Sequence, residues 1–227
     1  MRKMIVLNLK SNLTLDEYKE YLKKLQNVKY PFVLAPSYPY LALTKDFTLA
    51  SQNISPFKMG SYTGEVSGEM LKSLNVKYAI IGHSERIKYF NENGKILREK
   101  IKRCLENDIT PILCMSETFD VTKGVSNNIV QKLNNVIGRL SKSEREKVII
   151  AYEPYWAVGT NKMPTQECLN KIFGKIKENF KENKVLYGGS VNLETIDTLK
   201  KITLIDGYLI GSLSLDINEL CKLLEKI

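Results

Sequence analysis

Short apolar segments alternate with amphipathic ones along the whole chain, and this alternation is the strongest constraint on the fold. Eight segments have the length and the aliphatic, β-branched composition of buried strands, and a helical stretch follows most of them. The expected strands are residues 4–10, 32–35, 47–50, 76–81, 109–114, 148–152, 184–187 and 202–209. Such alternation predicts a parallel sheet with right-handed crossovers. Eight units in 227 residues favour a closed (β/α)8 barrel over an open doubly wound sheet.

The expected helices carry apolar residues three and four positions apart, so that one face of each can pack on the sheet. They are residues 14–25, 95–105 and 125–140, helices capped by Ser67 and Thr165, a short helix ending near residue 200, and a C-terminal helix. The first is predicted to turn Leu15, Tyr18, Leu22 and Leu25 inward. Residues 38–45 are too short for a full helix, so the second strand–helix unit is expected to be shortened and to leave a gap in the outer ring. No linker interrupts the pattern, so residues 1–227 are expected to form a single domain.

The charge pattern argues against several classes of partner. Lysine and arginine outnumber aspartate and glutamate by 34 to 25, a formal net charge of +9, but the excess is scattered along helices. Because no basic stripe with interleaved aromatics occurs, we expect no nucleic-acid partner; the positive field could still attract a small anionic substrate. No apolar run is long enough to span a bilayer, and the basic start is not followed by a signal-peptide cleavage site. We therefore expect a cytoplasmic protein with no membrane association.

The cysteines predict neither disulfides nor a zinc site. They are widely spaced, contain no C-x-x-C pair, and accompany a single histidine: Cys104, Cys114, Cys168 and Cys221. We expect four reduced thiols, mostly buried as small apolar side chains, and no metal.

The stretch around the sixth strand combines a carboxylate with an apolar loop. Glu153 ends the strand, Pro154 stops further pairing, and residues 156–159 are mostly apolar. Loops are normally polar, so an apolar tip suggests a lid that covers the carboxylate and excludes water. A shielded carboxylate is a competent general base. The alternative is an ordinary Glu-Pro turn whose tryptophan packs on a neighbouring helix.

Polar residues collect at the carboxyl ends of the expected strands. Asn8 and Lys10 follow the first strand, His83 the fourth and Glu153 the sixth. In a parallel barrel these ends share one rim, where barrel active sites lie. Lys10 can stabilise negative charge on an oxygen, and His83 at a helix start is expected to be neutral and able to donate one hydrogen bond to a carbonyl. A structural histidine satisfied by the backbone is the alternative for His83.

Glycine-flanked turns follow three of the later strands. Their backbone N–H groups can cradle a phosphate, and barrels often place a phosphate site after strands seven and eight. The residues concerned are Gly159, Ser190, Gly211 and Ser212. Together with a base (Glu153), a cation (Lys10) and a neutral electrophile (His83), this phosphate site suggests proton abstraction next to a carbonyl on a small phosphorylated substrate.

Five segments, in order along the chain, resemble the triosephosphate isomerase family. They are residues 8–10 (NLK), 60–65 (GSYTGE), 78–86 (YAIIGHSER), 151–160 (AYEPYWAVGT) and 187–191 (YGGSV). The resemblance implies a single TIM barrel that interconverts dihydroxyacetone phosphate and D-glyceraldehyde 3-phosphate, in glycolysis and gluconeogenesis, without metal or cofactor. It implies that Glu153 moves the proton between C1 and C2, that His83 is the neutral electrophile, and that Lys10 stabilises the enediolate. Lid closure would then keep the enediolate from expelling phosphate.

The same resemblance implies supporting roles and a homodimer. Asn8 would help to position the substrate, and Ser84 and Glu85 would support the polar network near Lys10. The loop of residues 60–65 would reach into a partner subunit, where Thr63 would brace the partner's active site. An ordinary glycine-rich surface loop is the alternative.

The chain departs from the family pattern at several positions. Leu9 stands where an aromatic residue is usual, Asn161 and residues 163–164 replace small residues of the lid hinge, and Ser212 replaces a glycine. The changes at Asn161 and residues 163–164 bear on the kinetics of the lid rather than on the chemistry, and little is lost at Ser212 if only its N–H is used. Two other functions compete with this one: another phosphate-binding barrel, such as a sugar-phosphate epimerase, and a basic barrel that binds RNA or protein.

Overall fold

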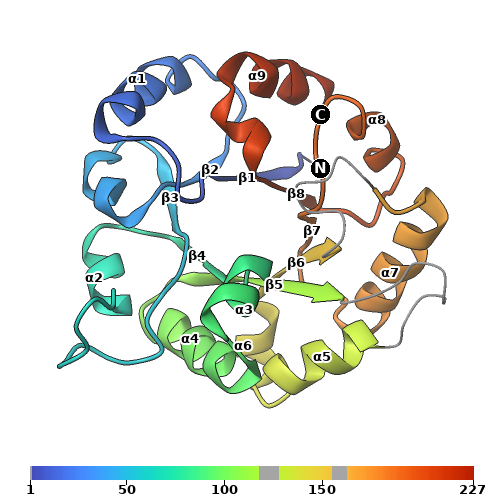
Figure 1. The fold of residues 1–227 in the computed structure, drawn as a ribbon. Coiled ribbons are helices and arrows are strands. Elements are labelled where there is room, and N and C mark those ends of the chain that lie inside the picture. The colour runs from blue at the N-terminus through green and yellow to red at the C-terminus, as the bar shows by residue number, and fades with distance from the viewer. Residues whose placement is uncertain (1, 118–127, 155–162) are drawn as a thin grey trace.

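Eight parallel strands close into a barrel in the order of the sequence (Figure 1). The computed structural model describes residues 2–117, 128–154 and 163–227. The strands are β1 (Met4–Asn8), β2 (Val33–Ala35), β3 (Thr48–Ser51), β4 (Tyr78–Ile81), β5 (Thr110–Glu117), β6 (Ile149–Pro154), β7 (Val185–Tyr187) and β8 (Gly207–Ile210). Pairing of β1 with β8 completes the ring, so the predicted (β/α)8 barrel is confirmed.

Helices surround the barrel on its outside (Figure 1). They are α1 (Leu15–Leu25), α2 (Gly68–Ser73), α3 (Ser84–Phe90), α4 (Gly94–Glu106), α5 (Asn128–Ile137), α6 (Lys142–Glu146), α7 (Gln166–Asn179), α8 (Ile196–Leu199) and α9 (Ile217–Lys226), with 3-10 helices η1 (Tyr38–Leu43) and η3 (Ser212–Leu215). None of the helices in the described parts of the chain is long and apolar enough to cross a membrane.

Alternation along the strands divides the buried side chains into two cores. In β1, Val6 points into the barrel, whereas Ile5 and Leu7 pack against the helices. The inner core is small and apolar: Val6, Val33, Ala35, Ala50, Ile80, Ile112, Cys114, Ile149, Ala151, Leu186 and Leu209. Because these side chains fill the interior, the barrel is not a pore, and a binding site must lie at one of its ends.

The second strand–helix unit is shortened as predicted, and η1 stands where an α-helix would. Leu41 of η1 is buried, and the ring of Tyr40 stacks on that of Tyr18 from α1, with 4.6 Å between centroids. The Tyr18 hydroxyl and Thr44 Oγ1 lie 2.6 Å apart. These contacts fill the gap that was expected in the outer ring.

Both predicted helix caps are confirmed. Ser67 Oγ accepts a hydrogen bond from the backbone N–H of Met70 at 3.3 Å, and Thr165 Oγ1 accepts one from that of Cys168 at 3.2 Å. The cysteines are free thiols, as expected, but only two are fully buried: Cys104 and Cys114 are buried, and Cys168 and Cys221 are partly exposed.

Several boundaries differ from those predicted. The first strand ends at Asn8 and not at Lys10, because Lys10 turns into the left-handed region with φ of 53°. The last strand begins at Gly207 and not at residue 202. The helix expected over residues 125–140 is observed over Asn128–Ile137, and residues 125–127 lie outside the described parts.

One predicted inward residue is wrong, and one helix was not predicted. Leu15, the first residue of α1, is 43% exposed, whereas Tyr18, Tyr21 and Leu25 of this helix are buried. The short helix α6 begins at a capping box in which Ser141 and Glu144 bond to each other's backbone N–H.

Candidate active site

Three strands bring the predicted polar residues to the carboxyl end of the barrel. Asn8 is the last residue of β1, His83 follows β4, and Glu153 lies near the end of β6. All three are buried, with 5%, 6% and 1% of their surface exposed. Residues that are far apart in sequence therefore meet at one mouth, as the topology predicted.

Glu153 uses both of its carboxylate oxygens. Oε2 accepts a hydrogen bond from the backbone N–H of Ser84 at 3.2 Å, and Oε1 lies 3.3 Å from His83 Nε2. Gly188 leaves room for this side chain, because a Cβ there would lie 2.9 Å from Glu153 Cγ. Burial, followed by the charge of the Glu153 carboxylate and its hydrogen bond with the thiol, raises the pKa of Cys114 well above its ordinary value. Cys114 therefore stays a neutral thiol beside the carboxylate.

The tautomer of His83 follows from its position as the N-cap of α3. Nδ1 accepts a hydrogen bond from the backbone N–H of Glu85 at 3.3 Å, so in the neutral ring the proton is on Nε2. Glu85 Oε2 also lies 3.4 Å from Nδ1, but this contact is a hydrogen bond only if the ring is protonated. In that tautomer the Nε2–H points toward Glu153 Oε1.

Lys10 is fixed at both its backbone and its side chain. Its Nζ forms an ion pair with Glu85 Oε1 at 2.7 Å. Its carbonyl oxygen accepts hydrogen bonds from Ser37 Oγ and Gln52 Nε2, each at 2.8 Å, and its amide donates to Asn8 Oδ1 at 3.1 Å. These bonds hold the left-handed backbone of Lys10, which is unfavourable for a residue with a side chain.

A cavity of about 490 Å³ opens beside Lys10 between the loops that follow β7 and β8. Ser190, Gly211 and Ser212 line it together with Lys10. A Cβ at Gly211 would lie 3.3 Å from Lys10 Cε, so the glycine lets the lysine approach the loop closely. The predicted phosphate-binding residues that the structure describes thus share one pocket with the predicted cation.

Two further predictions concern a residue expected to act on a partner subunit and residues that the structure does not describe. Thr63 lies exposed on the loop between β3 and α2, and no hydrogen bond is observed between it and the other site residues in the described parts of the chain. Gly159, the apolar lid tip and Asn161 lie outside the described residues.

Sequence reasoning missed three residues that shape the site. Gln52 and Ser37 support Lys10, and Cys114 lies beside Glu153. Two of them could have been found from their positions at the carboxyl ends of strands, since Gln52 comes directly after β3 and Ser37 lies two residues after β2. Cys114 lies inside β5, where nothing in the sequence distinguishes it from other small core residues.

Comparison with known proteins agrees with this geometry. The family model for triosephosphate isomerase matches residues 3–227. The chain is 40% identical to the triosephosphate isomerase of Mesomycoplasma hyopneumoniae (strain 7448), over 99% of both proteins. This chain belongs to the triosephosphate isomerase family. It is also 34% identical to the triosephosphate isomerase of Clostridium beijerinckii, over 95% of this chain and 96% of that protein. The resemblance drawn from five short segments therefore extends over nearly the whole chain.

Proposed function

We propose that Glu153, His83 and Lys10 carry out the family's reaction, the interconversion of dihydroxyacetone phosphate and D-glyceraldehyde 3-phosphate in glycolysis and gluconeogenesis. The observation that carries the proposal is the 3.3 Å approach of His83 Nε2 to Glu153 Oε1. Lys10 lies close by, because Glu85 contacts both Lys10 Nζ and His83 Nδ1. A base next to a neutral donor, with a cation nearby, is what an aldose–ketose isomerisation requires.

The proton transfer can be written with these groups. Glu153 removes a proton from C1 of dihydroxyacetone phosphate, and the C–H electrons form the C1–C2 double bond while the carbonyl electrons move to oxygen. His83 donates its Nε2 hydrogen bond to the developing enediolate oxygens, and Lys10 stabilises their negative charge. His83 gives its Nε2 proton to O2 and takes the O1 hydroxyl proton in its place. When Glu153 returns its proton to C2, the electrons of the C1–C2 double bond form the C2–H bond and the O1 electrons form the C1 carbonyl, which completes the isomerisation. No metal or organic cofactor enters this scheme.

The remaining site residues position the substrate in this proposal. Backbone N–H groups at Ser190, Gly211, Ser212 and Gly159 hold the phosphate. Asn8 orients the substrate, while Ser84 holds Glu153 and Glu85 holds Lys10. Ser212 needs to supply only its N–H, so its side chain does not interfere.

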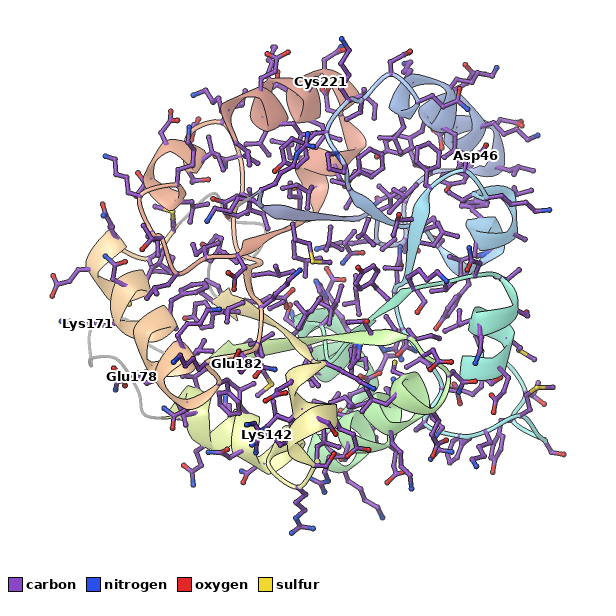
Figure 2. The ribbon with its side chains drawn as sticks, turned by 180° about the vertical axis from the view of Figure 1, so that it is seen from behind. Asp46, Lys142, Lys171, Glu178, Glu182 and Cys221 are labelled. Carbon is purple, nitrogen blue, oxygen red and sulfur yellow. The ribbon has the colours of Figure 1, made fainter. Side chains whose placement is uncertain are left out.

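Replacement of Glu153 by glutamine tests the assignment of the base. The assay couples production of dihydroxyacetone phosphate from glyceraldehyde 3-phosphate to a reporter dehydrogenase. Loss of a general base costs about 10²- to 10⁴-fold in turnover, and we expect a loss in this range with the fold retained. Glu178→Gln is the matched control, because Glu178 lies exposed on α7 (Figure 2). Near-native turnover in Glu153→Gln would refute the proposed base.

The same assay separates the rival functions. A basic barrel that binds RNA would show no isomerase activity and a strongly salt-dependent affinity for nucleic acid. An epimerase would act on a sugar phosphate and leave the trioses unchanged.

We also propose that the chain is a single-domain cytoplasmic enzyme that works as a homodimer. The loop that carries Thr63 exposes large apolar side chains, with Phe57 45%, Met59 62% and Tyr62 45% exposed, and Phe90 of α3 is 61% exposed. An apolar surface of this kind supports a protein interface. In the dimer, Thr63 of one subunit braces Asn8 and His83 of the other. A fully active monomer in sedimentation at assay concentration would rule this out.

A further inference from the structure

A second cavity of about 490 Å³ lies at the opposite end of the barrel from the active site. The starts of β1, β2, β3 and β4 and the residues that precede β7 and β8 surround it. Its volume is within the range of about 300–1,000 Å³ that is usual for small-molecule sites. We call this cavity the amino-end cavity.

The amino-end cavity has an excess of positive charge. Arg2, Lys3 and Lys184 line it, and Asp206 is the one acidic residue among the lining residues. The Asp206 carboxylate is already paired, because it accepts a hydrogen bond from Lys177 Nζ at 2.7 Å. Three cations therefore line the cavity with one carboxylate, which is already bonded to Lys177, and this excess of positive charge favours an anionic occupant.

Two of the three cations, Arg2 and Lys3, are held in place by neighbouring groups. The guanidinium of Arg2 lies over the ring of Tyr30, 4.5 Å from its centroid, a contact that occupies its face and not its N–H edge. Lys3 Nζ donates a hydrogen bond to the carbonyl oxygen of Ile205, which uses one of its three donors. A guanidinium edge and an ammonium group at fixed positions are suited to phosphate oxygens.

The walls of the cavity are partly aromatic. Phe32 and Tyr78 line it, and both are partly buried. Phe32 is fixed by stacking on Phe47, with 5.7 Å between ring centroids. Aromatic walls next to a cationic rim suit a ligand that carries a flat ring as well as phosphates.

We propose that the amino-end cavity binds a nucleoside triphosphate. Its phosphates contact Arg2, Lys3 and Lys184, and its base packs against Phe32 and Tyr78. The cavity is separate from the active site, since the packed interior of the barrel lies between the two ends.

Calorimetric titration of the full chain with ATP tests the proposal, with a chelator present and at physiological ionic strength. We expect saturable binding that weakens by about tenfold or more in Arg2→Gln/Lys184→Gln. The control is Lys142→Gln/Lys171→Gln, which removes two charges from the outer helices, where both side chains are exposed (Figure 2). We expect the control to lose less than about twofold, and both variants to keep isomerase turnover.

Other outcomes would overturn the proposal. Equal losses in the two double variants would mean general attraction to a protein of charge +9. Displacement of ATP by glycerol 3-phosphate would place it at the active site. If tripolyphosphate binds as tightly as ATP, the aromatic walls do not contribute to binding, and the cavity is not a nucleotide site. If Arg2→Gln/Lys184→Gln does not fold, Lys184→Glu alone must lower the affinity, or the site is refuted.

Discussion

Gly188 controls where the proposed base lies, so Gly188→Ala should slow the enzyme without unfolding it. A Cβ at this position would lie 2.9 Å from Glu153 Cγ and 3.4 Å from Oε1. Carbon atoms prefer separations of about 3.5–4.0 Å, so the carboxylate must shift by roughly 0.6–1.1 Å. A misplacement of about 1 Å costs on the order of 10²-fold in rate, which corresponds to about 2.7 kcal/mol of activation free energy.

This substitution changes the position of the Glu153 carboxylate but not its chemistry, because Glu153 itself is kept. The measurement is kcat in the coupled assay, with the melting temperature as the test of folding. Gly174→Ala is the matched control: Gly174 lies in α7, a Cβ there would meet no atom within 4 Å, and alanine favours a helix. A kcat for Gly188→Ala within threefold of the parent enzyme, with the fold intact, would refute the argument that contact at this glycine sets the position of Glu153.

Three further predictions concern the rest of the chain. Thiol titration of the native protein should label Cys168 and Cys221 quickly and the other two cysteines only after unfolding, because burial raises the pKa of both buried thiols. Burial also raises the pKa of Tyr18 from 10.0 to about 12, against a hydrogen bond with Thr44 that lowers it. The neutral Tyr18 side chain therefore contributes its full stabilisation below pH 10 and loses it as the pH rises from about 10 to 12. The urea midpoint of unfolding should fall over that interval, and it should fall less in Tyr18→Phe than in the parent protein, because phenylalanine has no group to ionise. Glu92→Ala should lower the unfolding free energy by about 3–5 kcal/mol in urea titrations, because Lys100 would be left buried without its carboxylate.

The sequence predicted the barrel because its two periodicities are strong and repeat eight times. The same topology placed His83 and Glu153 at one mouth, where His83 Nε2 and Glu153 Oε1 lie 3.3 Å apart. The helix α6 was not predicted, although Ser141 and Glu144 have the spacing of a capping box that would have indicated it.

Contacts between side chains on different helices and strands could not be predicted from the sequence. Nothing near Tyr40 indicates that its ring will stack on Tyr18 and close the ring of helices. The left-handed backbone of Lys10 was also missed, because no local feature favours it. It is stabilised by Ser37 and Gln52 from two later strand ends, and such support exists only once the barrel has closed.

In the mechanism proposed above, the contacts of Glu153 link activation of the base to binding of the substrate. In this structure its Oε1 faces His83 Nε2, and its Oε2 accepts the N–H of Ser84. A neutral imidazole with its proton on Nε2 has one hydrogen bond to give. When a substrate carbonyl takes that hydrogen bond, Glu153 Oε1 loses its partner and becomes free to accept a proton from carbon. One histidine proton therefore polarises the carbonyl and releases the base in the same step, which requires the two residues to lie within reach of each other before the substrate arrives.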